Sequence, residues 1–268
     1  MALVPFPGTP DPYDGDRDDD ESPGADKMSF LEHLDELRKR LIVSVSSLGV
    51  GFVVSWIFID RLVDFIFGPL RATIKGGKFQ YTEPGEFFML QMKLAALAGL
   101  FLALPVILWQ IWRFVAPGLY SNEKRLAIPF VVLSTVFFTL GAAFSHYVAF
   151  PWTMQFFASF ERAEIVFIPR IAPVFGMYVK MMLAMGLVFE MPTAVYFLAR
   201  VGLVTAGFLL RQFKYAVLVI FVAAAILTPG TDVVSQALMA GPMIVLYIIS
   251  IGIAWMFAKK KAPVDPDA

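Results

Sequence analysis

Three glutamates occupy positions where a carboxylate could bind a cation or move a proton. Glu36 precedes the basic run Arg38-Lys39-Arg40 just before the first long apolar stretch, and Glu123 is the sole carboxylate of a basic loop. A carboxylate held among cations stays ionised and is suited to bidentate pairing with a guanidinium. Glu36 and Glu123 are therefore predicted to receive two arginine side chains.

Each of these two segments also has a purely structural interpretation. Ser29-Phe30-Leu31-Glu32 matches a capping box, and apolar residues follow it at helical spacing, so the helix could simply anchor the first span at the interface. In the loop 114–125, Pro117-Gly118 favours a turn, and Glu123 suits the first turn of the next helix. Both interpretations stay open on these residues alone.

Glu190 lies inside an apolar run, about nine residues from its predicted inner end and so ~13 Å deep at 1.5 Å per residue. An ionisable group at that depth is costly and marks a polar interior or a cavity, or else it is a neutral, hydrogen-bonded structural acid. Pro192 follows closely and predicts a kink. Lys93 and Lys180 each stand about seven residues from the outer end of a run, and we interpret them as snorkelling anchors.

The sequence shows no sign of catalysis or of a cofactor. It contains no cysteine, no phosphate-binding loop, no H-E-x-x-H and no G-x-S-x-G motif. Its two histidines, His33 and His146, fall on segments predicted at opposite faces of the membrane, so a shared metal site is not expected. We expect a protein that is not an enzyme, holds no cofactor or metal and draws on the membrane potential, worth ~2.3 kcal/mol per charge per 100 mV.

The composition indicates an all-α integral membrane protein. Of 268 residues, 58% are hydrophobic and 16% charged, whereas soluble domains average about 25% charged residues. Spanning ~30 Å of hydrocarbon takes ~20 helical residues. Six membrane spans are predicted at Leu41–Ile59, Phe87–Trp112, Leu126–Tyr147, Val174–Ala199, Tyr215–Leu227 and Val233–Ala258.

The fifth apolar run is short, and the distribution of charge decides how it is interpreted. Its 13 residues cover only ~20 Å, which suggests a thin membrane, a shielded span or a re-entrant hairpin. With six spans and an inner N-terminus, fourteen of the 22 basic residues fall on the inner side, six on the outer side and two within spans. This bias favours six spans with both termini in the cytoplasm.

The chain divides into a membrane domain with a tail at each end. Residues 1–26 hold eight acids against one base, with five prolines, a composition that favours disorder. We expect a disordered acidic cytoplasmic tail at 1–28, the membrane domain at 29–258 and a short cytoplasmic tail at 259–268.

Several strings together resemble TatC, the multispanning subunit of the twin-arginine protein translocase. They occur in the order and spacing of that family, from about Ser29 to Phe257. The strings are His33-Leu34-Asp35-Glu36-Leu37-Arg38-Lys39-Arg40-Leu41, Pro105 to Trp112, Phe114 to Tyr120 with Glu123-Lys124-Arg125, Gly186 to Pro192, and Leu227-Thr228-Pro229 with Asp232 and Ser235-Gln236.

The resemblance implies a six-span, glove-shaped receptor in the cytoplasmic membrane, with both termini inside. Its cytoplasmic surface would bind the paired arginines of signal peptides on folded cargo. The implied signal-peptide residues are Glu36, Glu123, Arg38, Phe114, Pro117, Leu119, Tyr120 and Arg125.

The resemblance also implies protein partners, with no role for nucleic acid. Glu190 would be the polar residue of a concave membrane face, and the last two spans would dock single-span TatA-like and TatB-like subunits, with Gln236 and Asp232 near that contact. Asp232 also suits the N-cap of the sixth span, and Gln236 could bond across helices. A homo-oligomer within the complex is expected.

Two other classes of function remain to be separated from a receptor. A proton-coupled solute transporter would use Glu190 as its proton site, and substituting Glu36 or Glu123 by alanine would leave its activity nearly unchanged. A scaffold subunit would organise partners and bind no signal peptide.

Overall fold

The computed structural model describes residues 30–73, 79–115, 127–162, 164, 167–228 and 233–257. Within these ranges the chain is almost entirely helical, with an isolated bridge between Gln80 and Arg170. The helices are α1 (Phe30–Ile57), α2 (Ile59–Thr73), α3 (Glu86–Val115), α4 (Ala127–Phe144), the π-helical turn η3 (Ser145–Ala149), α5 (Phe150–Ala158), α6 (Ile171–Val201), α7 (Ala206–Arg211), α8 (Phe213–Leu227) and α9 (Val233–Phe257).

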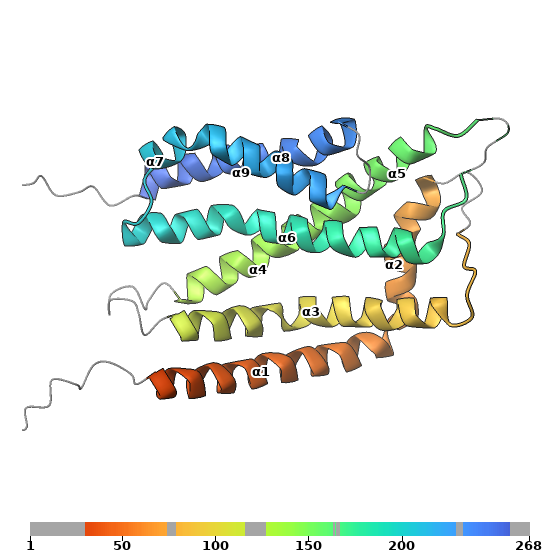
Figure 1. Ribbon diagram of the computed structural model, residues 1–268. Coiled ribbons are helices and arrows are strands. Elements are labelled where there is room, and N and C mark those ends of the chain that lie inside the picture. Colours follow the sequence, from red (N-terminus) through yellow and green to blue (C-terminus); the bar gives the residue numbers. More distant parts are fainter. Residues whose placement is uncertain are drawn as a thin grey trace, which may run out of the picture.

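Among the described residues, five helical segments are long and apolar enough to cross a membrane, and α8 is a shorter apolar helix. Each of these six segments overlaps one of the six predicted spans. The 15 residues of α8 cover only ~22 Å, so the short fifth span is real. The long helices run antiparallel to their chain neighbours (Figure 1). We call the end of the bundle where α1 begins the Glu36 end, and the opposite end, where α3 and α6 begin, the Glu86 end.

Three features of the helices differ from the sequence-based expectation. The first helix continues from Phe30 into the span without a break, so the segment from Phe30 onward is part of the span helix and not a separate interfacial helix. The third span continues through η3 and α5 to Ala158, well past Tyr147. The segment after the first span forms α2, which we did not predict, and its apolar side buries Val63, Ile66 and Phe67.

One stripe of α1 faces α3, with polar residues at one end of the stripe and small residues in its middle. Residues spaced three or four apart are buried or half-buried, while Leu37, Leu41 and Val45 face outward. A Cβ atom on Gly51 would lie 2.5 Å from the carbonyl oxygen of Gly99, and one on Gly99 would lie 2.6 Å from the backbone nitrogen of Phe52. The two backbones therefore touch, which in membranes requires small residues at the contact. The inward stripe consists of His33, Glu36, Arg40, Ser44, Ser47, Gly51 and Ser55.

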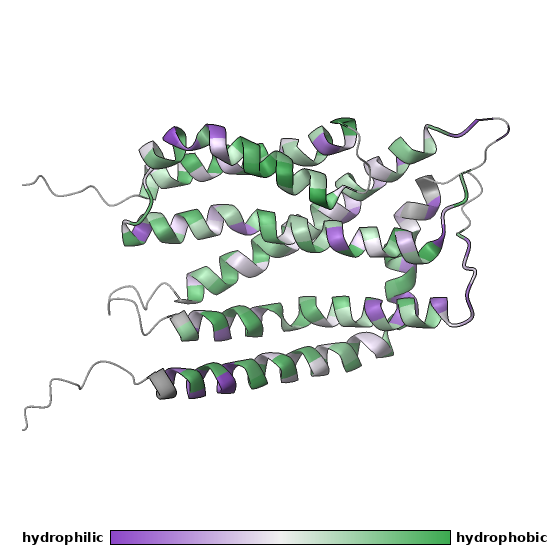
Figure 2. Cartoon of the chain, in the orientation of Figure 1, coloured by the Kyte–Doolittle hydropathy of each residue, from purple (hydrophilic) through white to green (hydrophobic). Residues whose placement is uncertain are grey.

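The core of the bundle forms around α6. This helix packs against α3, α4, η3, α8 and α9, and Tyr178, Met181 and Met185 on it are fully buried. A Cβ atom on Gly141 would collide with the carbonyl oxygen of Met185, so α4 and α6 also meet backbone to backbone. Figure 2 shows that the long helices consist mostly of hydrophobic residues, as expected for helices that cross a membrane.

Candidate functional site

At the Glu36 end, Glu36 is held between α1 and α3 by an arginine on its own helix. Arg40 donates from Nη2 to Glu36 Oε1 at 2.5 Å and from Nη1 to Gln110 Oε1 on α3 at 3.3 Å. The side chains of Glu36 and Arg40 are only 16% and 18% exposed. The second carboxylate oxygen, Oε2, is buried and has no hydrogen-bond partner among the described residues. Glu36 therefore keeps one acceptor atom for a further donor.

An aromatic contact closes the α1–α3 interface beside this carboxylate. The rings of His33 and Phe114 stack, with centroids 4.4 Å apart and planes at 25°. His33 lies almost one turn before Glu36 on α1, and Phe114 lies one turn after Gln110 on α3. Two of the predicted residues, Glu36 and Phe114, are therefore brought to the same interface from positions 78 apart in the sequence.

The remaining predicted signal-peptide residues are not gathered here by the described structure. Arg38 is exposed on α1, and residues two apart on a helix do not face each other, so it points away from Glu36. The others, Pro117, Leu119, Tyr120, Glu123 and Arg125, lie outside the described residues, as do Ser29 and the two terminal tails.

Glu190 and Gln236, two further polar residues singled out within spans, lie on α6 and α9. Glu190 is half-buried eleven residues before the end of α6, and its Oε1 atom is buried without a hydrogen-bond partner among the described residues. Gln236 donates from Nε2 to the carbonyl oxygen of Phe221 on α8 at 2.8 Å, which confirms the predicted bond across helices. Asp232 lies outside the described residues.

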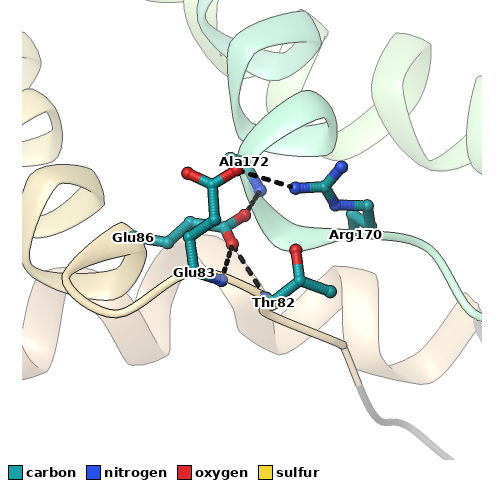
Figure 3. A network of polar contacts seen from close by, with 5 residues as sticks. All are labelled: Thr82, Glu83, Glu86, Arg170 and Ala172. Atoms are coloured by element: carbon teal, nitrogen blue, oxygen red, sulfur yellow. Dashed lines mark hydrogen bonds and ion pairs between the residues drawn. The ribbon is translucent and has the colours of Figure 1, made fainter.

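At the Glu86 end, a carboxylate joins α3 to α6 (Figure 3). Glu86 Oε2 accepts from the backbone N–H groups of Thr82 and Glu83 at 3.0 and 3.3 Å, and its Oε1 accepts from the N–H of Ala172 at 3.2 Å. Glu83 in turn faces Arg170, with 3.8 Å between Oε1 and Nη2. The sequence interpretation missed this network, although a glutamate at the first residue of a helix signals that it can bond nearby backbone N–H groups.

A further cluster that the sequence did not indicate surrounds His146 in the π-helical turn. Its Nδ1 atom is hydrogen-bonded to the hydroxyl of Tyr178 at 3.0 Å, and its ring stacks on Phe65 of α2 at 4.7 Å. His146 is 2% exposed, and it lies in η3, whereas His33 lies in the first turn of α1. This cluster ties α2 and η3 to α6.

Comparison with known proteins decides the family. The family model for the Sec-independent protein translocase protein (TatC) matches residues 32–242. The chain belongs to the TatC family. It is 43% identical over 244 residues to the TatC protein of Desulforapulum autotrophicum, covering 91% of this chain and 90% of that protein, and 40% identical over 237 residues to that of Koribacter versatilis, covering 87% of each.

Solved structures carry the same fold. The chain superposes on a crystal structure of the twin-arginine translocase receptor TatC with a TM-score of 0.72 at 33% identity, covering 83% of this chain and 98% of that one. A second TatC structure, in the detergent DDM, gives a TM-score of 0.73 at 32% identity, covering 83% of this chain and 99% of that one. The chain is thus a six-span, all-α membrane protein of the TatC family, which forms part of a protein translocase and is not an enzyme.

Proposed function

We propose that this TatC-family protein is the signal-peptide receptor of a twin-arginine translocase, with the Glu36 end in the cytoplasm. Glu36 and Glu123 bind the paired arginines of a signal peptide on folded cargo, and Arg38, Phe114, Pro117, Leu119, Tyr120 and Arg125 shape the same surface. The observation that carries the proposal is Glu36 Oε2, a carboxylate oxygen with no partner among the described residues, on an acid already fixed by Arg40.

In this proposal the fixed carboxylate favours arginine over lysine. Arg40, bonded to Gln110, restrains Glu36 before the ligand arrives, so little side-chain freedom is lost on binding. A hydrogen bond to a charged group contributes about 1.5–3 kcal/mol, and a guanidinium presents planar paired donors that an ammonium lacks. The stacked rings of His33 and Phe114 provide an aromatic surface beside the acceptor oxygen.

The proposal extends to the membrane, the partners and the energy source. The protein lies in the cytoplasmic membrane with both termini inside, which the excess of basic residues on the Glu36 side supports. TatA-like and TatB-like single-span subunits dock along α8 and α9, near Gln236 and Asp232, and several copies of the chain assemble in the complex. Transport draws on the membrane potential.

The test is photocrosslinking of a twin-arginine signal peptide to the purified full-length protein. Wild type should be labelled strongly, and Glu36→Ala/Glu123→Ala at least tenfold less at the same peptide concentration. The matched control Asp60→Ala/Glu164→Ala removes two exposed acids of the opposite end and should label like wild type. A peptide with two lysines in place of the arginines should label wild type weakly.

Two outcomes would overturn the assignment. Equal labelling of wild type and Glu36→Ala/Glu123→Ala would show that these acids do not hold the peptide. Absence of labelling in every variant would favour a scaffold that only organises partners. In a transport assay, a proton-coupled carrier would lose activity in Glu190→Gln and keep it in the double alanine variant, whereas the receptor proposal expects the double variant to fail.

A further inference from the structure

A groove lies between α3 and α6 near the Glu86 end. Its lining is charged at the level of two lysines and apolar farther from the Glu86 end. Its volume is about 960 Å³. Lys93 and Lys180 line it, both exposed, and neither forms an ion pair or hydrogen bond with another described residue. The apolar lining includes Ala96, Leu97, Leu100, Val179 and Leu183.

The two lysines are held at one depth by the network that joins the helix starts. Glu86 and Ala172 are hydrogen-bonded to each other, so they fix a common level on α3 and α6. Lys93 is seven residues beyond Glu86 and Lys180 is eight beyond Ala172, and the two helices run in the same direction. At 1.5 Å per residue, both Cα atoms lie ~10–12 Å below that level.

The carboxylates at the mouth of the groove are engaged elsewhere. Glu86 accepts three backbone N–H groups, and Glu83 faces Arg170. The two ammonium groups therefore lack a counter-ion among the described residues, at a depth where an uncompensated charge is expensive. An anion entering the groove would supply it.

We propose that this groove binds one anionic phospholipid, with the phosphate between Lys93 and Lys180 and an acyl chain along α3 and α6. The apolar residues Leu97, Leu100 and Leu183 lie three to seven residues deeper than the lysines, so the lining changes from charged to apolar along the direction a lipid chain follows. A cationic signal peptide does not fit, because like charges would meet. In the proposed orientation this lipid belongs to the outer leaflet.

The experiment is native mass spectrometry of the full-length protein in detergent, titrated with phosphatidylglycerol or with phosphatidylcholine of the same acyl chains. A basic residue beside an anionic lipid contributes about fivefold in affinity, so two give a preference of about 25-fold for the anionic lipid at one site. In Lys93→Gln/Lys180→Gln this preference should fall to about one. Lys93→Arg/Lys180→Arg should retain it.

Matched variants separate the groove from general charge and from misfolding. Arg211→Gln/Lys214→Gln removes two exposed cations at the other end and should keep the preference. Gly176→Leu fills the groove without altering charge, since a Cβ there meets nothing within 4 Å, and should reduce occupancy by both lipids. Gly252→Leu, at an equally open site on α9, should not.

Two results would overturn the lipid site. One is equal affinity of wild type for the two lipids, which is what simple snorkelling of the lysines would give. The other is an undiminished preference for phosphatidylglycerol in Lys93→Gln/Lys180→Gln. Thermal unfolding of each variant in the same detergent identifies any that fail to fold, and the Gly176→Leu and Gly252→Leu pair then tests the site with the lysines intact.

Discussion

Gly51→Ala should destabilise the protein although it adds a single methyl group. The added Cβ would lie 2.5 Å from the carbonyl oxygen of Gly99, 3.0 Å from its Cα and 3.1 Å from its carbonyl carbon. All three are backbone atoms, so no side chain can turn away. Reaching an ordinary contact of about 3.4 Å requires α1 and α3 to separate by roughly 0.9 Å, and overpacking of this kind costs about 1–3 kcal/mol.

The separation should also weaken signal-peptide binding in the proposed function. Arg40 reaches Gln110 across the α1–α3 interface at 3.3 Å, already near the limit for a hydrogen bond, and His33 stacks on Phe114 across the same interface. Moving α1 away would therefore release the restraint on Glu36.

The assay for Gly51→Ala is thermal unfolding in detergent, with peptide crosslinking on the same samples. The control is Gly49→Ala, two residues earlier on the same helix, where an added Cβ meets nothing within 4 Å. At about 2–4 °C per kcal/mol, Gly51→Ala should lower the melting temperature by several degrees relative to Gly49→Ala. Equal melting temperatures for the two variants would refute the backbone contact between α1 and α3.

Two further predictions concern polar contacts of the bundle. Tyr178→Phe removes the partner of the buried His146 Nδ1 and should cost about 1–2 kcal/mol of stability in thermal unfolding, whereas Tyr147→Phe, at a ring 60% exposed, should change little. Glu86→Ala removes the acceptor of the Ala172 N–H, so hydrogen exchange at that amide should accelerate, with Glu86→Gln intermediate because its carbonyl oxygen can still accept one bond. Unchanged exchange in Glu86→Ala would show that the bond between Glu86 and Ala172 does not form in solution.

The spans could be predicted from the sequence because long apolar runs leave few alternatives in a membrane. Helix α2 was missed because Asp60, Arg61, Asp64 and Arg71 give its segment the charge content of a loop, and only the spacing of its apolar residues indicates a helix. The residues Ser145 to Ala149 could themselves continue an ordinary α-helix, and the nearby irregularity in the sequence is Pro151, which cannot donate a helical hydrogen bond to Tyr147.

The candidate site was predictable in part. Glu36 and Arg40 are four residues apart on a helix, a spacing that indicates an ion pair. The bond from Arg40 to Gln110 spans 70 positions, and the stack of His33 on Phe114 spans 81, so local pattern could not reveal either. Lys93 and Lys180 looked like separate anchors because only the packing of α3 against α6 puts them in one groove.

The π-helical turn lets the third membrane span pack against two different helices. In an uninterrupted α-helix, residues at helical spacing face the same neighbour along the whole length. A single wider turn rotates the direction in which every later side chain points. The chain before the turn packs on α6 and the chain after it packs on α2. A loop could produce the same change of direction, but it would expose many backbone N–H and C=O groups where hydrocarbon offers no partner. Here the chain stays helical through the turn, and the N–H that is missing is that of Pro151.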